Sequence, residues 1–278
     1  MKIDVAYMSA AGNIFAVVDN KDNLLSESNL TDLAKELCSK SSNREMDTEG
    51  LMLLEESKNY DFECKFFNPD GSTGMMCGNG GRAIVRFASS VKHIDKEKDT
   101  IRFFMANDIY EAKFLDDNID LTMAEVKFEH EKQLSIDNKV INTYFVDNGS
   151  QHIVINIDEF DLKDINKIDI NDLGKKVRFN SELEPVGANA NFYSFSDGFV
   201  NLRTYERGVE KETGACGTGA VATAIAAHRD LGIEFPIHII PTSNDKLSID
   251  KQILKGNKIY HLIGPAKILK TSTFELNK

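Results

Sequence analysis

Two cysteines occur in the same unusual sequence context, separated by half of the 278-residue chain. Cys77 lies in Met-Cys-Gly-Asn-Gly-Gly and Cys216 in Ala-Cys-Gly-Thr-Gly-Ala. Strand-like residues and a turn-rich loop precede each segment, and a helical pattern follows it. The amides and the dipole at a helix N-terminus lower the pKa of a thiol and attract small anions. Two such thiols on opposite sides of one bound anion would form an acid/base pair that moves a proton across a carbon centre.

The same order of elements is predicted around both cysteines. Helical spacing is expected at 30–38 and 82–91 in the first half, and at 220–228 in the second half, with a weakly helical polar stretch at 161–176. Short alternating runs bounded by turn residues predict strands elsewhere. We therefore expect an α+β protein of two structurally similar, pseudo-symmetric domains, each a β-sheet or barrel wrapped around a central helix.

The boundary between the domains is expected in a charged stretch, 129–139, which has no strong hydrophobic period. This gives an N-terminal domain at 1–128, with Cys77, and a C-terminal domain at 129–278, with Cys216. The active site is expected in a cleft between them. The last strand is expected to cross back to the first domain.

Composition limits the classes of function. Hydrophobic residues make up 41% of the chain and charged residues 28%, which is ordinary for a globular protein. A net charge of -11 argues against a nucleic-acid partner, because no basic stripe is available. Neither a membrane-spanning run nor a secretion signal is recognisable, so a cytoplasmic protein without a membrane partner is expected.

The remaining cysteines and the histidines do not suggest another site. Cys38 falls in a helical pattern and Cys64 on an alternating strand, so both are expected to be buried core thiols. The cysteines show no CxxC spacing and the histidines no metal-ligand spacing, so no metal is expected. His152 is interpreted as structural.

Several short motifs together resemble the diaminopimelate epimerase family, which comprises cofactor-independent amino-acid racemases and epimerases. The resemblance covers nearly the whole chain and rests on Ala11–Asn13, Asn68–Ser72, Met76–Gly80, Asn189–Phe192, Glu206–Gly208 and Ala215–Gly219. Proline racemase and its relatives share the two-domain plan. The Glu-Arg-Gly ahead of the second cysteine favours the diaminopimelate branch.

The resemblance implies a mechanism and a set of site residues. Cys77 and Cys216 would be the catalytic thiol and thiolate, with no cofactor and no metal. The substrate would be an amino acid, as a small-molecule partner, bound by Asn13, Asn68, Gly78, Asn79, Asn189, Glu206, Arg207, Gly217 and Thr218. Taken alone, each asparagine is more typical of a turn or a helix cap than of a ligand-binding residue. Glu206 and Arg207, taken alone, could form a surface ion pair. A homodimer is a further expectation.

Two departures from the family pattern bear on the substrate. Gly50 stands where many members have a glutamine, and Ser150 where they have an asparagine that helps to bind the distal end of diaminopimelate. These changes favour a racemase of a single-headed amino acid such as histidine, with diaminopimelate epimerase as the alternative. A non-catalytic amino-acid-binding protein is a remote third possibility, which the presence of both cysteines disfavours.

Overall fold

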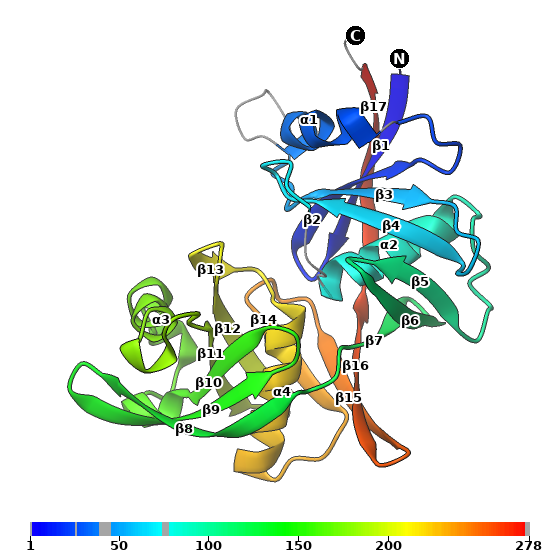
Figure 1. Ribbon diagram of the computed structural model, residues 1–278. Helices are drawn as coiled ribbons and strands as arrows, with labels where there is room; N and C mark the ends of the chain where they lie inside the picture. Colours follow the sequence, from blue (N-terminus) through cyan, green and yellow to red (C-terminus); the bar gives the residue numbers. More distant parts are fainter. Residues whose placement is uncertain (1, 26, 39–45, 74–77, 276–278) are drawn as a thin grey trace. The chain divides into compact units, whose positions relative to one another are not determined.

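The computed structural model describes residues 2–25, 27–38, 46–73 and 78–275 (Figure 1). Its contacts divide the chain into two compact units, one made of Met1–Leu121 with Gly264–Lys278 and the other of Thr122–Ile263. Among the described residues, none of the helices is both long and apolar enough to cross a bilayer.

Each unit is built on one extended sheet. The first unit contains β1 (Lys2–Ala10), β2 (Asn13–Asp19), α1 (Glu27–Cys38), β3 (Leu51–Glu55), β4 (Phe62–Phe67), α2 (Gly78–Ser90), β5 (Ile101–Met105), β6 (Asp108–Leu115), β7 (Asn118–Thr122) and β17 (Lys267–Glu275). Strand β17 pairs with β1, and the order then runs from β1 to β7. The β2–β3 and β4–β5 pairs are parallel, and the others are antiparallel.

The second unit repeats this arrangement. It contains β8 (Phe128–Ile136), β9 (Lys139–Asp147), β10 (Gln151–Asn156), η1 (Ile157–Phe160), η2 (Ile165–Lys167), α3 (Ile170–Arg178), η3 (Ser181–Leu183), β11 (Asn189–Ser196), β12 (Phe199–Glu206), β13 (Lys211–Thr213), α4 (Gly217–Leu231), β14 (Ile237–Pro241), β15 (Leu247–Leu254) and β16 (Asn257–Pro265). Its sheet order is β8, β9, β10, β11, β12, β14, β15, β16, with β10–β11 and β12–β14 parallel.

The two units therefore have the same sequence of strand directions, from β1 to β7 and from β9 to β16. Strand β17 lies against β1 as β8 lies against β9, both in antiparallel pairs. The last strand of the chain thus supplies the neighbour that β1 would otherwise lack. The expected α+β fold of two pseudo-symmetric halves is confirmed.

The charged stretch 129–139 forms most of β8 and the turn into β9. β8 pairs with β9 along its whole length, and Asp137 and Asn138 form the turn with φ of 50° and 62°. Most of β8 is exposed, so its charged side chains carry no hydrophobic period. The division between the compact units lies at Leu121–Thr122, whereas the sequence placed the domain boundary at 128.

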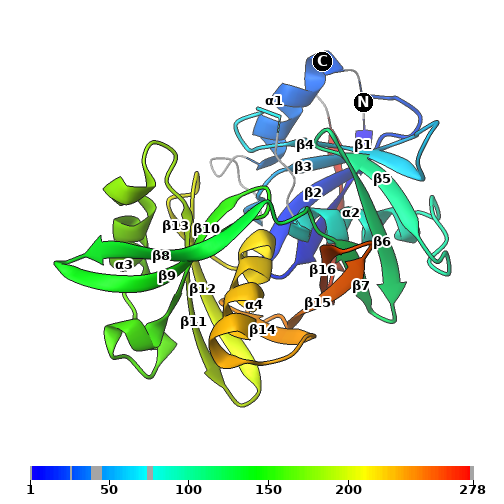
Figure 2. The ribbon, with the colours of Figure 1, turned by 60° about the horizontal axis from the view of Figure 1, so that its bottom comes forward.

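A buried helix occupies the centre of each unit. α4 packs against β10, β11, β12 and β14 (Figure 2), and α2 packs against β1, β2, β3 and β17. Ten of the 13 residues of α2 and ten of the 15 residues of α4 are buried, and seven of the ten in α4 are alanine or glycine. A helix with small side chains on every face can be surrounded by a sheet at close distance. Both helices begin earlier than predicted, at Gly78 and Gly217.

The sheet of the second unit is buried on both faces. Ala190 and Phe192 of β11 belong to an apolar cluster that includes residues of α3. Asn191 and Tyr193 alternate with them and face the other side, toward α4. The stretch 161–176 is correspondingly only partly α-helical, since η2 precedes α3, which begins after the N-cap Asp169.

Candidate active site

Cys216 lies at a junction of loop and helix, as the sequence predicted, and it occupies the N-cap position of α4. Its backbone is extended (φ -116°, ψ 115°), and its carbonyl accepts the first intrahelical bond from the Ala220 amide at 2.8 Å. The residue is 8% exposed. The unpaired amides of the first helical turn and the positive end of the helix dipole favour the thiolate form of a cysteine placed here.

A chain of polar side chains leads from Cys216 into the sheet. The Sγ atom lies 3.4 Å from Thr218 Oγ1, which lies 3.0 Å from His152 Nε2 on β10. His152 Nδ1 lies 3.1 Å from Asn191 Nδ2 on β11, and Asn191 Oδ1 accepts a bond from the Thr204 hydroxyl at 3.0 Å. Three adjacent strands thus supply the groups behind the thiol.

His152 is neutral in this environment. It is fully buried, and burial is the main cause that lowers its pKa from 6.5 to about 3, with the charge of Arg207 as a second cause. The sequence interpretation of His152 as structural did not include its contact with Thr218. The alternation of residues along the strand indicates that a position is buried but not which group it contacts, although His152 does lie beside a family motif.

Helix α4 approaches the sheet closely at this point. A Cβ added to Gly219 would lie 2.4 Å from Asn191 Oδ1 and 3.4 Å from Cys216 Sγ. Asn148 holds the same turn, since its Nδ2 donates to the Thr218 carbonyl at 2.9 Å. Glycine after the cysteine therefore permits a contact that a larger residue would block.

Asn189 links two segments of the expected binding site. Its Nδ2 donates to Ser150 Oγ and to the Gln151 carbonyl, both at 2.9 Å, and its Oδ1 accepts the Arg207 amide at 2.8 Å. Ser150 thus pairs with Asn189. Both amide hydrogens of Asn189 are used within the protein, so only its oxygen has remaining capacity.

Glu206 and Arg207 lie at the end of β12 and are half-buried. Glu206 Oε2 accepts a bond from the Thr213 hydroxyl at 3.0 Å, and Arg207 Nη1 lies 3.5 Å from the Gly187 carbonyl. The following turn is closed by Glu210, whose carboxylate accepts the Gly208 amide at 3.0 Å and pairs with Arg178. Glu206 is therefore held by β13, and the side chain of Arg207 by the backbone at Gly187.

The first unit has a different polar network at the start of α2. Arg82, which is fully buried, donates from Nη2 to Asn79 Oδ1 at 2.9 Å and from Nη1 to the Gly78 carbonyl at 3.3 Å. Asn79 Nδ2 in turn donates to Asn13 Oδ1 at 2.6 Å. The structure thus brings the predicted residues Asn13, Gly78 and Asn79 together. Arg82 was not predicted, because a buried arginine resembles a surface one in sequence.

Two further site residues were predicted in this unit. Cys77 lies outside the described residues. Asn68 closes the turn before α2: its amide N–H donates to the Ser72 carbonyl at 2.8 Å and its Nδ2 donates to Ser72 Oγ at 2.9 Å. The turn interpretation of Asn68 is confirmed, and its substrate contact stays a prediction.

Gly50 has a packing role that the sequence did not reveal. A Cβ there would lie 2.6 Å from the Phe67 carbonyl and 2.7 Å from the ring of Phe66. The Phe66 ring also packs edge-on against Phe15, with centroids 6.2 Å apart. An aromatic ring therefore fills the space beside Gly50, and the effect of Gly50 on the choice of substrate stays a prediction.

The other two cysteines belong to the core, as predicted. Cys38 lies in the apolar cluster beneath α1. Cys64 lies on β4, where burial raises the pKa of its thiol well above the usual range. Within the described part of the chain, no group of three or more histidine, cysteine or acidic residues is placed to hold a metal ion.

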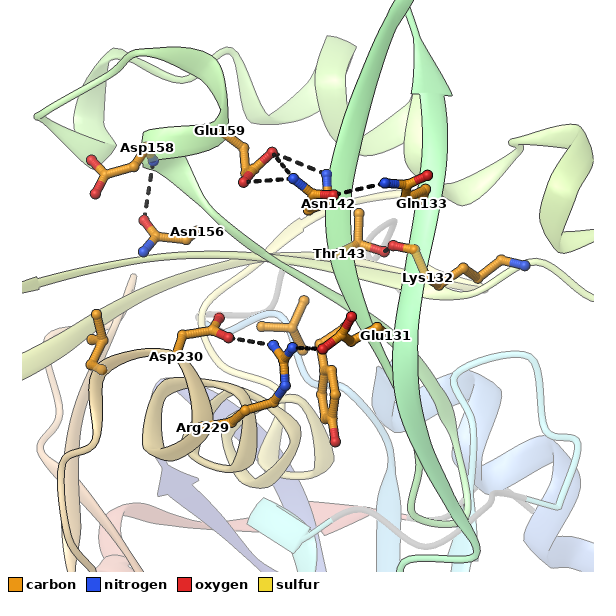
Figure 3. A pocket seen from close by; sticks show the side chains of 13 residues that line it. Glu131, Lys132, Gln133, Asn142, Thr143, Asn156, Asp158, Glu159, Arg229 and Asp230 are labelled. Atoms are coloured by element: carbon orange, nitrogen blue, oxygen red, sulfur yellow. Dashed lines mark hydrogen bonds and ion pairs between the residues drawn. The ribbon is translucent and has the colours of Figure 1, made fainter.

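A separate groove of about 550 Å³ lies at the opposite end of α4 from Cys216 (Figure 3). Its polar side chains largely pair with one another: Arg229 pairs with Glu131 and Asp230, and Glu159 with Asn142. None of the predicted site residues lines it. The groove is therefore distinct from the candidate active site.

Comparison with known proteins identifies the family. The diaminopimelate epimerase family model matches residues 5–129 and 144–268, which include both cysteines. The chain belongs to the diaminopimelate epimerase family. Membership in this family makes the protein an isomerase of the racemase and epimerase type.

Curated relatives named diaminopimelate epimerase match most of the chain. The protein from Aquifex aeolicus is 32% identical over 270 residues, which cover 91% of this chain and 93% of the relative. The protein from Chlorobaculum tepidum is 37% identical over 226 residues, or 80% of this chain and 82% of the relative.

Solved structures confirm the family fold. A Bacillus anthracis phenazine biosynthesis protein of the PhzF family superposes with a TM-score of 0.73 at 13% identity, covering 99% of this chain and 100% of the other. A hydroxyproline epimerase from Agrobacterium vitis gives a TM-score of 0.69 at 13% identity, with 98% and 92% coverage. At these identities the likeness concerns the fold alone.

Proposed function

We propose that this member of the family is a cofactor-independent diaminopimelate epimerase, which inverts one α-carbon between the LL and meso forms. The observation that carries the proposal is the N-cap position of Cys216 on α4, with a hydroxyl within reach of its Sγ. The names of the curated relatives support the choice of substrate.

The proposed reaction uses Cys77 and Cys216 as a two-base pair. One cysteine, as thiolate, removes the α-hydrogen as a proton, and the electron pair of the C–H bond moves into an enolate of the α-carboxylate. The other cysteine, as thiol, delivers its proton to the opposite face and is left as thiolate. The roles reverse for the opposite configuration.

The helix ends are assigned to the substrate carboxylate. Backbone amides at the start of each helix, Gly78 and Asn79 on α2 and Gly217 and Thr218 on α4, would bind the carboxylate and stabilise the charge that develops on it. This stabilisation is what a reaction without an electron-accepting cofactor requires. The buried first turn of α4 supports the assignment, because its amides are shielded from water.

The remaining predicted residues are assigned to the two head groups. Glu206 and the Arg207 backbone would hold the α-ammonium group. Asn13, Asn68, Asn189 and the Arg207 side chain would line the rest of the pocket. The hydrogen bond from Arg207 to Asn189 supports this grouping, since it couples two of these residues directly.

The sequence departures favoured histidine as substrate, but two observations weaken that choice. The adjoining Phe66 ring accounts for the glycine at position 50, because a side chain there would collide with it. The hydroxyl of Ser150 accepts a hydrogen bond from Asn189, another predicted site residue. Relatives that cover most of the chain carry the name diaminopimelate epimerase. Diaminopimelate epimerase, the alternative in the sequence analysis, is therefore the proposed function. Turnover of a single-headed amino acid instead of diaminopimelate is the result that would contradict it.

A panel of substrates in heavy water tests the proposal. We expect deuterium at Cα and a change in circular dichroism with LL- and meso-diaminopimelate, and neither with L-histidine or L-proline. Exchange with histidine alone would replace diaminopimelate by a single-headed substrate. A protein that binds these amino acids without exchange would be a binding protein.

The same assay tests independence from cofactors. We expect turnover to be unchanged after dialysis against a chelator and on addition of pyridoxal phosphate. Loss of activity on chelation, restored by a metal ion, would contradict the two-thiol scheme.

A further inference from the structure

The orientation of the Asn191 side chain is fixed by its neighbours. Its Nδ2 lies 3.1 Å from the Ile153 carbonyl, and a carbonyl can only accept a hydrogen bond. Its Oδ1 accepts the Thr204 hydroxyl at 3.0 Å. The Ile153 contact requires the NH₂ group, not the oxygen, to face β10. The Thr204 contact agrees with this orientation, since a hydroxyl can donate to the amide oxygen.

This orientation selects one tautomer of His152. The NH₂ group of Asn191 faces His152 Nδ1 at 3.1 Å, so Nδ1 must be the unprotonated acceptor. The single ring proton of the neutral imidazole then resides on Nε2. Nε2 donates it to Thr218 Oγ1 at 3.0 Å.

The hydrogen bond from His152 also fixes the direction in which the Thr218 hydroxyl donates. Since its oxygen accepts from His152, its own hydrogen is available for Cys216 Sγ at 3.4 Å. With the opposite tautomer, Nε2 would accept the hydroxyl hydrogen, and Thr218 would no longer donate to the sulfur. We call this chain of hydrogen bonds, from His152 through Thr218 to Cys216, the relay. Its direction depends on Asn191, which does not touch the thiol itself.

We propose that Asn191 is a positioning residue for catalysis: it holds His152 as the Nε2–H tautomer, so that the Thr218 hydroxyl donates to Cys216 Sγ and stabilises the thiolate. The proposal rests on the acid/base role proposed for Cys216. Its sharpest geometric support is the close approach of Gly219 to Asn191 Oδ1, which keeps the amide against the helix end.

The surroundings keep the relay intact over a wide range of pH. His152 and Asn191 are fully buried, and the charged group that acts on His152 is Arg207, which opposes a second ring proton. A doubly protonated imidazole would have no acceptor for the amide of Asn191. The imidazole therefore stays neutral and donates from Nε2 to Thr218 Oγ1.

A spectroscopic measurement tests the tautomer without any substitution. The ¹⁵N chemical shifts of the imidazole in the intact protein distinguish the two neutral tautomers, and a His152→Gln variant assigns the signals. We expect the proton on Nε2. A proton on Nδ1 would overturn the proposal.

Thiol titration tests the consequence for Cys216. The pH dependence of iodoacetamide alkylation, followed at the Cys216 peptide by mass spectrometry, gives its pKa in a Cys77→Ala background. We expect Asn191→Leu and Thr218→Val each to raise that pKa by about one unit. Thr218→Val removes the donor to the thiolate, and Asn191→Leu removes the contact that directs the Thr218 hydroxyl toward it. The double variant should add little, since both changes break one relay.

Thr223→Val is the matched control. Thr223 is a buried threonine of the same helix, whose hydroxyl donates to the Gly219 carbonyl at 2.8 Å, outside the relay. We expect no shift of the Cys216 pKa in this variant. A shift with Thr218→Val but none with folded Asn191→Leu would overturn the role of Asn191. This titration needs no substrate, so its outcome is independent of whether diaminopimelate is turned over.

Discussion

The starts of α2 and α4 occupy equivalent places in the two units, yet they are built from different groups. At α2 a buried arginine, Arg82, donates to Asn79 and to the Gly78 carbonyl. At α4 the neutral imidazole of His152 lies between Thr218 and Asn191. One helix end thus carries a permanent buried cation, and the other a relay whose members are uncharged.

This difference shows where a duplicated fold is constrained. The strand directions and the central helix repeat because the sheet must surround a buried helix in both units. That packing does not determine which polar side chains lie at the helix ends, so these can differ between the two units. The repeat of the backbone therefore does not predict a repeat of the polar side chains that support each helix end.

The largest expected effect comes from removing either thiol. Cys77→Ala and Cys216→Ala should each lower kcat/KM for diaminopimelate by about 10³-fold or more, because inversion needs an acid on one face and a base on the other. Racemisation followed by circular dichroism measures the loss. If one of the two variants kept most of its activity, a one-base mechanism would replace the proposed pair.

Cys64→Ala is the control for loss of a thiol. Cys64 is buried on β4, and burial raises the pKa of its thiol, so it is not suited to proton transfer. Its replacement should lower stability and leave kcat/KM within about twofold of the unmodified protein.

The next effect tests the buried cation of the first unit. Arg82→Met should lower the free energy of unfolding by about 2–3 kcal/mol, since it leaves the Asn79 oxygen and the Gly78 carbonyl without this donor. Urea unfolding measures the change. Arg86→Met, on the same helix, should cost less than half as much, because Arg86 is only half-buried.

The general plan of this molecule could be predicted from sequence. The two Cys-Gly-x-Gly segments, followed by helical patterns, located both central helices and the duplication. Strand alternation found most of the sheet, because apolar residues repeat with the strand period. A strand was predicted within β9, at 140–146, but its partner β8 was missed, since β8 is mostly exposed and its residues show no such period.

The polar networks could not be predicted in the same way. His152 and Asn191 alternate with core residues on their strands, so a buried polar residue there signals neither its partner nor its tautomer. Arg82 has the sequence signature of a surface residue. The role of Gly50 depends on Phe66, which lies on a neighbouring strand, so no local pattern could reveal it.

Gly50 and Ser150 provide the next comparison, because both depart from the family pattern. Gly50→Gln should lower the free energy of unfolding by about 1–3 kcal/mol, since its Cβ would press on the Phe67 carbonyl. Ser150→Asn should cost less than about 1 kcal/mol, because Ser150 is half-exposed. Chemical unfolding gives both values. Enhanced diaminopimelate turnover in a stable Gly50→Gln protein would contradict the packing role.

The smallest effect concerns the pH dependence of stability. His152 has a folded-state pKa of about 3, below its unfolded value of 6.5. The unfolded chain therefore binds a proton that the folded protein does not, so this stabilisation is complete above pH 6.5 and is lost as pH falls toward 3.

His152→Gln should remove this component. Relative to the variant, the unmodified protein should lose about 1.4 kcal/mol of unfolding free energy between pH 7.5 and 5.5, because the unfolded imidazole becomes protonated over that range. Urea unfolding at several pH values measures the slopes, and His130→Gln, at an exposed position on β8, controls for loss of an imidazole. Equal slopes for the unmodified protein and His152→Gln would mean that His152 takes up a proton in the folded state. The imidazole could then no longer accept from Asn191, and the contrast between a charged and a neutral helix end would disappear.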